Sequence, residues 1–237
     1  MNNNLVTLDV DWAPDFMISF SLRALLENQV KSTWFITHES PILEELRDNS
    51  DLVELGVHPN FLSGSSHGEK VDEVLDYVMR LVPGANCVRA HGVVQSGSIL
   101  SDFVRLAALR VDATIFLPEM PGIQPVKHLT PYGELLRIPT FWADDYEILK
   151  DDSEWNAQRY MGQQGLKMFN FHPIHIYLNT KDNAHYNDFR NSGVKLNTAT
   201  PDDVEPFINK GVGVRDFFLE LVSRNDVQGK FLREFLS

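Results

Sequence analysis

The stretch Leu5-Val6-Thr7-Leu8-Asp9-Val10-Asp11-Trp12 runs from apolar and β-favouring residues directly into two carboxylates. This pattern predicts a strand that ends at the acids. Side chains alternate between the two faces of a strand, so Asp9 and Asp11 are expected to point the same way, roughly 7 Å apart. Two carboxylates on one buried face need a positive partner, which a metal ion, an arginine or a shared proton could provide. At an exposed strand end, the same pair would only cap the next helix.

The composition is that of a globular protein, and we expect residues 1–237 to form one domain. The chain is 43% hydrophobic and 23% charged, and no run approaches the roughly eighteen apolar residues of a membrane-spanning helix. The formal net charge of -12 disfavours nucleic acid and anionic membranes as partners. Cys87 is the single cysteine and cannot form an internal disulfide, and the first residues lack the pattern of a secretory signal. These features favour a cytoplasmic location.

Short apolar runs alternate with segments of helical period along most of the chain. After the first strand, further strands are expected at residues 32–36, 51–57, 86–89, 111–116, 134–138 and 165–171. Helices are expected at residues 16–27, 40–46, 69–81 and 98–109, with two short ones within 213–236. This alternation predicts an α/β fold, a distorted barrel of about seven parallel strands. No glycine-rich phosphate loop follows the first strand, which disfavours an open dinucleotide-binding sheet.

Titratable side chains gather at the ends of the expected strands. Besides the two acids of the first strand, these are His58, Arg89, His91 and His172. Catalytic groups of barrel enzymes project from the C-terminal ends of the strands. A lone histidine there is more often structural, but two imidazoles and a carboxylate together could bind a divalent cation such as zinc.

Two further spacings bear on the candidate site. His67 follows His58 by nine positions across a loop rich in Ser and Gly, a spacing that permits a shared metal without requiring one. His172 and His175 are three apart, so in extended chain they would point to opposite faces and only one would enter the site. Arg89 leaves an apolar strand, and a buried guanidinium needs a carboxylate partner. Asp9 is the obvious one.

In their order along the chain, these residues resemble the motifs of the metal-dependent polysaccharide deacetylases of the NodB type. Thr7-Leu8-Asp9-Val10-Asp11 looks like that family's Thr-Phe-Asp-Asp-Gly strand with one residue between the acids. His58 matches the first of two metal-binding histidines, Arg89 the arginine after the fourth strand, and His172-Pro173 the histidine after the last strand. The resemblance covers roughly residues 5 to 180 and implies a distorted barrel.

The resemblance also implies a mechanism, metal-assisted hydrolysis of an amide or ester. By this analogy Asp11, His58 and His67 would bind a divalent metal, with zinc as the expected ion. The metal would polarise the acyl carbonyl and lower the pKa of its bound water to about 7.

The proton-transfer roles carried over from the family fall on three other residues. Asp9 would take the proton from the water, with Arg89 keeping the carboxylate ionised and oriented. His172 would protonate the departing amine or alcohol.

The chain departs from the family pattern at two places. The family separates its two histidines by four positions, so His67 requires the loop to fold back, and otherwise Asn60 or water could take its place. Where many relatives have Arg-x-Pro, this chain has Arg89-Ala90-His91, which makes His91 an alternative ligand or a substrate contact. The segment 141–145 loosely matches an Asp-Trp segment that supports the catalytic residues in relatives.

We expect the substrate to be an acylated amino sugar or sugar conjugate. Trp12, His91 and Trp142 are the candidate substrate contacts, together with Phe141, although aromatic residues near strand ends are more often core. The alternatives are hydrolysis of a cyclic amide, and a barrel that binds carbohydrate without turnover. A small saccharide precursor or sugar nucleotide is favoured over polymer. The net charge of -12 speaks against a polyphosphate unless basic side chains line the mouth.

Overall fold

The computed structural model describes residues 3–236, in which nine strands form one sheet. Their order across the sheet is β6-β7-β5-β4-β3-β2-β1-β9-β8. The strands are β1 (Asn3–Asp9), β2 (Ser32–Ile36), β3 (Val53–Val57), β4 (Cys87–Val88), β5 (Val111–Asp112), β6 (Val126–Thr130), β7 (Gly133–Arg137), β8 (Trp142–Ala143) and β9 (Leu166–Phe171). All neighbours are parallel except β6 and β7, which form an antiparallel hairpin.

One segment, residues 133–143, brings the two ends of the curled sheet together. Its first half is β7, which pairs with β5, and its second half is β8, which pairs with β9. Between them, the Thr140 N–H donates to the Ile115 carbonyl at 2.7 Å, and the Phe141 N–H donates to the Met168 carbonyl at 2.9 Å. The predicted α/β fold with a distorted barrel is therefore confirmed.

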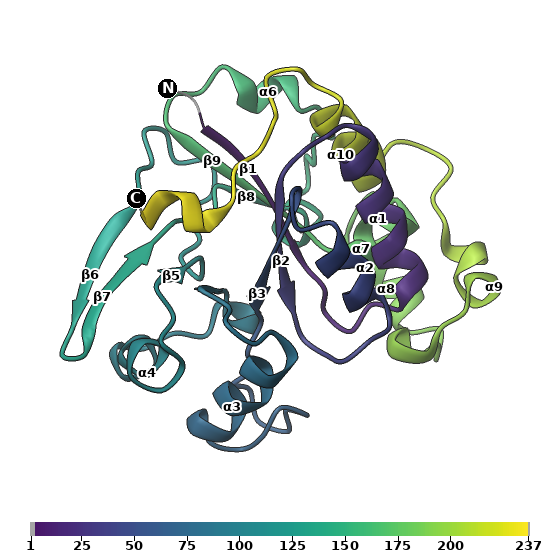
Figure 1. Ribbon diagram of the computed structural model, residues 1–237. Coiled ribbons are helices and arrows are strands. Elements are labelled where there is room, and N and C mark those ends of the chain that lie inside the picture. The colour runs from purple at the N-terminus through teal and green to yellow at the C-terminus, as the bar shows by residue number, and fades with distance from the viewer. Residues whose placement is uncertain (1–2, 237) are drawn as a thin grey trace.

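Helices surround the sheet (Figure 1). α1, α7 and α10 pack against one another on one side, and α3 packs against α4. The α-helices are α1 (Asp15–Glu27), α2 (Ile42–Asp48), α3 (Val71–Leu81), α4 (Gly97–Ala107), α5 (Asp144–Glu147), α6 (Gln158–Met161), α7 (Pro173–Leu178), α8 (Asn183–Arg190), α9 (Pro201–Val204) and α10 (Val214–Val222). The 3-10 turns are η1 (His91–Val93), η2 (Leu196–Thr198), η3 (Glu205–Phe207) and η4 (Leu232–Leu236). Within 3–236, none of the helices has the length and apolar character needed to span a bilayer.

Burial explains why the central strands could be predicted. All five residues of β2 are buried, and Leu5, Val6 and Leu8 of β1 have no exposed surface. Strands covered on both faces are rich in apolar and β-favouring residues, and this enrichment is visible in the sequence. α3 buries one stripe, Val74, Leu75, Val78 and Leu81, at helical spacing.

Three of the differences between the structure and the predictions concern strands, and the short helices α5 to α9 were not predicted either. β6 lies between the strands expected at 111–116 and 134–138, where no strand was predicted, because its side chains are largely exposed and give no apolar run. β8, a two-residue strand at the edge of the sheet, was not predicted. β1 ends at Asp9, and Asp11 and Trp12 have φ of 44° and 56°, in the left-handed region. Asp11 therefore reaches the site from a tight turn and not by strand alternation.

Candidate active site

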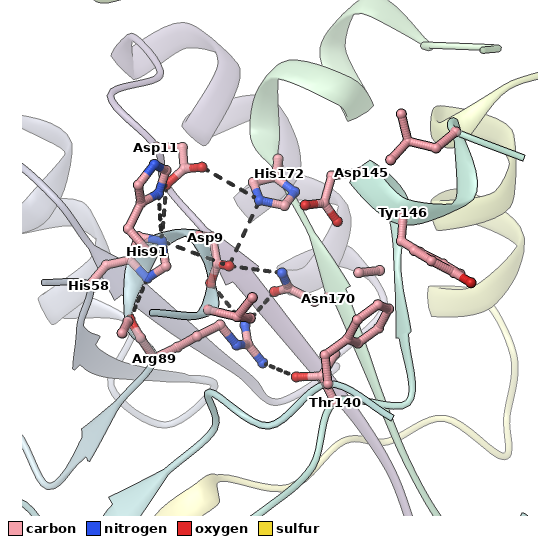
Figure 2. A pocket seen from close by; sticks show the side chains of 16 residues that line it. Asp9, Asp11, His58, Arg89, His91, Thr140, Asp145, Tyr146, Asn170 and His172 are labelled. Atoms are coloured by element: carbon pink, nitrogen blue, oxygen red, sulfur yellow. Dashed lines mark hydrogen bonds and ion pairs between the residues drawn. The ribbon is translucent and has the colours of Figure 1, made fainter. Parts of the chain in front are cut away.

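The C-terminal ends of β1, β3, β4 and β9 meet at one pocket of about 360 Å³ (Figure 2). It is lined by Asp9, Asp11, His58, Arg89, Ala90, His91, Gly92, Val93, Phe116, Thr140, Ala143, Asp145, Tyr146, Leu149, Asn170 and His172. The structure thus brings together six of the titratable residues singled out in the sequence. These residues converge because the C-terminal ends of parallel strands lie along one rim of the barrel.

Asp9 lies at the floor of the pocket and is held on both carboxylate oxygens. Arg89 Nη1 donates to Asp9 Oδ1 at 2.8 Å, which confirms the ion pair predicted from the sequence. Asn170 Nδ2 donates to Asp9 Oδ2 at 2.9 Å. The guanidinium is itself fixed, since its Nε donates to the Ala113 carbonyl and its Nη2 to the Thr140 hydroxyl. Asp9 is therefore buried, oriented and paired.

These surroundings set the protonation state of Asp9. Burial alone would raise the pKa of the Asp9 carboxyl. The positive charge of the Arg89 guanidinium lowers this pKa, and His58 and His172 lower it further. The net result is a pKa below the usual 3.8, so Asp9 is a carboxylate at neutral pH.

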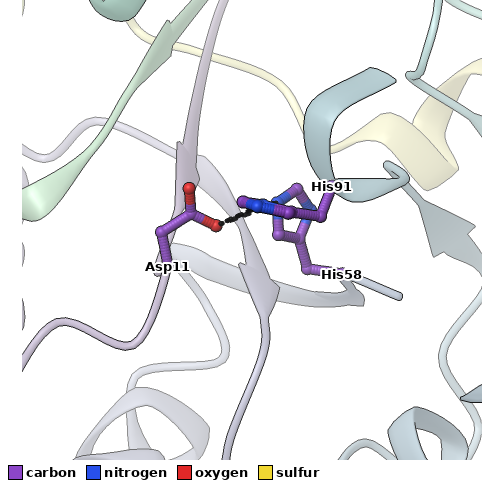
Figure 3. A group of neighbouring side chains, drawn as sticks. All are labelled: Asp11, His58 and His91. Carbon is purple, nitrogen blue, oxygen red and sulfur yellow. Dashed lines mark hydrogen bonds and ion pairs between the residues drawn. The ribbon is translucent and has the colours of Figure 1, made fainter. Parts of the chain in front are cut away.

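Asp11, His58 and His91 form a second group beside Asp9, each offering one ligand atom (Figure 3). Asp11 Oδ1 is 3.1 Å from both His58 Nε2 and His91 Nδ1, and the two nitrogens are 3.3 Å apart. The backbone brings the two histidines together, because the His91 N–H donates to the carbonyl of Pro59 at 2.9 Å.

This group fits a divalent cation. His58 Nδ1 donates to the Arg89 carbonyl at 2.6 Å, which leaves the lone pair of Nε2 facing Asp11 and His91. Three acceptor atoms directed at one another need a proton or a cation between them. Zinc bonds of about 2.0–2.2 Å in a tetrahedron separate the ligand atoms by about 3.3 Å, close to the spacing observed. Two imidazoles with a carboxylate, in a pocket that leaves room for water, are a donor set that zinc accepts.

His172 faces the same space from the opposite side, at the start of α7. Its Nδ1 is 2.6 Å from Asp144 Oδ1, and its backbone N–H donates to Asp144 Oδ2 at 2.8 Å. Its Nε2 is 3.6 Å from Asp11 Oδ2 and 3.8 Å from Asp9 Oδ2. Burial favours the neutral ring, but the Asp144 carboxylate and its hydrogen bond outweigh burial and raise the pKa of His172 well above 6.5.

His67 and Trp12 lie beside the pocket rather than on its wall. His67 is buried, accepts the Asn60 N–H at Nδ1, and stacks on Tyr77 with ring centroids 4.8 Å apart. Burial lowers the pKa of His67 to about 4, so the ring is neutral. Trp12 contacts the rings of both His67 and His91, at 5.5 and 5.2 Å. The structure therefore places His91, and not His67, in the group with Asp11 and His58.

Two other residues considered in the sequence are buried outside the pocket. Trp142 is 2% exposed and stacks on Phe217 with ring centroids 4.4 Å apart, so the expectation that it contacts substrate is wrong. His175 lies on the first turn of α7, with Nδ1 3.2 Å from the Thr180 hydroxyl, and it does not line the pocket.

We predict that Trp142→Ala destabilises the protein by about 3–5 kcal/mol, the usual cost of truncating a buried tryptophan. Urea unfolding measures the change, and Trp142→Phe, which keeps an aromatic ring, should lose less. If Trp142 instead contacted substrate, the alanine variant would keep its stability and raise KM.

Sequence reasoning missed Asn170 and the individual role of Asp144. Apart from Lys167, Asn170 is the one polar residue of the apolar strand 166–171. A polar residue in such a strand is a signal that its side chain points into a polar site. Asp144 lies within the segment 141–145, which was expected to support the catalytic residues, and its contact with His172 agrees with that expectation. Phe116, Tyr146 and Leu149 at the mouth carry no signal in sequence, because a half-exposed apolar residue after a strand is common.

The fold and the site define a class of protein: a distorted α/β barrel of the polysaccharide deacetylase type. The family model described as WbmS-like, polysaccharide deacetylase, matches residues 6–190. A crystal structure from Bordetella bronchiseptica, named for a polysaccharide deacetylase involved in O-antigen biosynthesis, is 37% identical, with a TM-score of 0.80. The match covers 94% of this chain and 90% of that one.

The chain therefore belongs to the WbmS-like polysaccharide deacetylase family. This confirms the resemblance seen in the sequence. A 4-alpha-glucanotransferase from Thermococcus litoralis, at 11% identity and a TM-score of 0.50, covers 100% of this chain and 38% of its own, and it shows the fold alone. A comparison with curated proteins gives no match.

Proposed function

We propose that the protein is a metal-dependent deacetylase that hydrolyses the N-acyl group of an amino sugar within a saccharide. One observation carries the proposal: a cation-binding group, a paired carboxylate and a carboxylate-bound histidine face the same 360 Å³ pocket. Amide hydrolysis needs a polarised carbonyl, a base for water and an acid for the leaving amine, and these three groups can supply them.

Asp11, His58 and His91 would hold the cation, which we propose to be zinc. When bound, such an ion supplies a Lewis acid for the acyl oxygen and lowers the pKa of a bound water to about 7. His91 takes the position that the resemblance had given to His67, because its Nδ1 lies 3.1 Å from Asp11 Oδ1.

Asp9 accepts the proton of the attacking water. Its lowered pKa keeps it ionised, and the bonds from Arg89 and Asn170 fix its orientation. His172 donates the proton at Nε2 to the departing amine. Asp144 holds the ring in position through Nδ1 and keeps it protonated. The acid and the base are close together, with His172 Nε2 3.8 Å from Asp9 Oδ2, so both can reach the same reacting centre. Their retention favours catalysis over a barrel that only binds carbohydrate.

The similarity to a protein named for O-antigen biosynthesis supports a saccharide of bacterial surface polysaccharide as the substrate. Acetate release tests the proposal directly. A panel of N-acetylated monosaccharide glycosides and oligosaccharides is incubated with protein loaded with zinc, cobalt or manganese. We expect release from at least one neutral glycan and none after chelation. No release across the panel with any metal would contradict the proposed activity.

The pH dependence of that activity gives a further prediction. Asp144 raises the pKa of His172, so a protonated His172 is available up to a pH well above 6.5, and activity falls as pH rises through the folded pKa. Asp144→Asn removes the negative charge, so His172 loses its proton at lower pH. The alkaline limb of kcat/KM should therefore move to lower pH. An unchanged alkaline limb would show that this limb reports the titration of a group other than His172.

A further inference from the structure

The mouth of the pocket combines an unpaired carboxylate with an apolar rim. Asp145 lies beside His172, with its carboxylate toward the pocket (Figure 2). Among the described residues 3–236, that carboxylate has no hydrogen-bond or ion-pair partner; only the Asp145 backbone N–H is bonded, to Asp144 Oδ1. Asp145 thus differs from Asp9, whose two oxygens are both occupied.

Around Asp145 the rim is apolar and accessible. Tyr146 is 39% exposed, Leu149 61% and Val93 48%. Phe116 packs edge-on against Tyr146, with ring centroids 5.1 Å apart. A pyranose ring has an apolar face and an edge of hydroxyl donors, so an aromatic pair next to a free carboxylate can bind both parts of one sugar unit.

Among the residues 3–236, no unpaired lysine or arginine lines the same surface. Arg89 is the single Lys or Arg among the lining residues of the described chain, and it is buried and paired with Asp9. Lys150 lies over the Tyr146 ring at 5.3 Å, but it forms ion pairs with Glu119 and Glu147. Phosphate recognition relies on arginine clusters, lysines or free backbone N–H groups.

We infer that the site selects a neutral, phosphate-free saccharide, and that Asp145 is the residue that determines this selectivity. Its carboxylate accepts hydrogen bonds from sugar hydroxyls and repels an anionic group at the mouth. The inference rests on the proposed function and narrows its substrate. From the sequence, a sugar nucleotide was expected as substrate only if basic side chains lined the mouth. Within the described part of the chain the mouth lacks them, so the inference excludes the sugar nucleotide.

The test compares two substrates with the same N-acetylhexosamine, its methyl glycoside and its uridine diphosphate conjugate. The zinc-loaded protein should hydrolyse the glycoside at least about tenfold better in kcat/KM. Asp145→Asn keeps the size of the side chain and removes its charge, so it should shrink this preference by about fivefold, the scale of a like-charge contact in water. Added salt should shrink the wild-type preference too. Asp151→Asn, the same change at an exposed position outside the pocket, should leave it unaltered.

Equal or better turnover of the nucleotide conjugate would overturn the inference while leaving the deacetylase proposal intact. An unchanged preference in Asp145→Asn would remove Asp145 from the selectivity. If neither compound releases acetate, calorimetric binding of the same pair still decides the charge selectivity, and the proposed activity is decided by the full panel. Tighter binding of the glycoside would support the inference. Equal binding, tighter binding of the nucleotide conjugate or binding of neither would contradict it.

Discussion

Asp11→Ala, His58→Ala and His91→Ala should each lose the bound cation, whereas His67→Ala should retain it. The wild-type protein should bind about one zinc ion per chain after dialysis, as a three-residue site implies. Removing any one ligand of three leaves the remaining donor atoms too few to compete with buffer. We expect His67→Ala to keep the zinc because His67 Nδ1 accepts the Asn60 N–H and the His67 ring stacks on Tyr77.

Elemental analysis gives the zinc content, and thermal unfolding with and without zinc gives a second readout. A ligand at about one hundred times its Kd stabilises the folded state by about 2.7 kcal/mol, so zinc should raise the Tm of the wild type and of His67→Ala but not that of the Asp11, His58 and His91 variants. His128→Ala, on the β6–β7 hairpin, is the matched histidine control and should behave as wild type. Loss of zinc from His67→Ala with retention in His91→Ala would restore His67 as the third ligand, the role that the family resemblance implied.

The exchange of His67 for His91 illustrates what sequence spacing can and cannot decide. Counting from His58 pointed to the next histidine along the chain. The residue that meets His58 in space instead follows the neighbouring strand, because β3 and β4 pair in parallel and the His91 N–H bonds to the carbonyl of Pro59. Strand adjacency of this kind is a long-range property that a local motif does not encode. In the sequence, His91 was visible as a histidine at the end of an expected strand and as a departure from the family's Arg-x-Pro pattern.

The buried ion pair between Asp9 and Arg89, in contrast, could be predicted from the sequence. Arg89 in an apolar strand requires a carboxylate, and Asp9 at the end of another apolar strand requires a cation, so each residue's desolvation cost identified the other. The central strands were predictable for a related reason, since burial on both faces favours apolar and β-favouring residues, such as Trp34, Phe35 and Ile36 in β2. The exposed hairpin strand β6 and the two-residue strand β8 have no such pattern. The closure of the barrel through residues 133–143 therefore could not be read from the sequence.

The second large effect is expected from a substitution of Asp9, the carboxylate paired with Arg89. Asp9→Asn should reduce kcat by roughly a hundred- to ten-thousand-fold, the contribution typical of a general base. The amide has nearly the shape of the carboxylate but cannot accept a proton from water. Its oxygen can still accept the Arg89 hydrogen bond, but the buried guanidinium loses its counter-charge, which lowers the stability of the variant. Zinc content should remain near one per chain, because Asp9 is outside the group formed by Asp11, His58 and His91.

A loss of stability must be separated from a loss of chemistry, because the new amide would face the Asn170 amide across 2.9 Å. Asp112→Asn is the matched control. Asp112 is also fully buried and paired with an arginine, its Oδ2 lying 2.6 Å from Arg137 Nε, but it does not line the pocket. We expect both variants to unfold at lower denaturant concentration than the wild type and only Asp9→Asn to lose turnover. Full turnover in Asp9→Asn would exclude Asp9 as the base, and loss of zinc together with turnover would assign it to the cation instead.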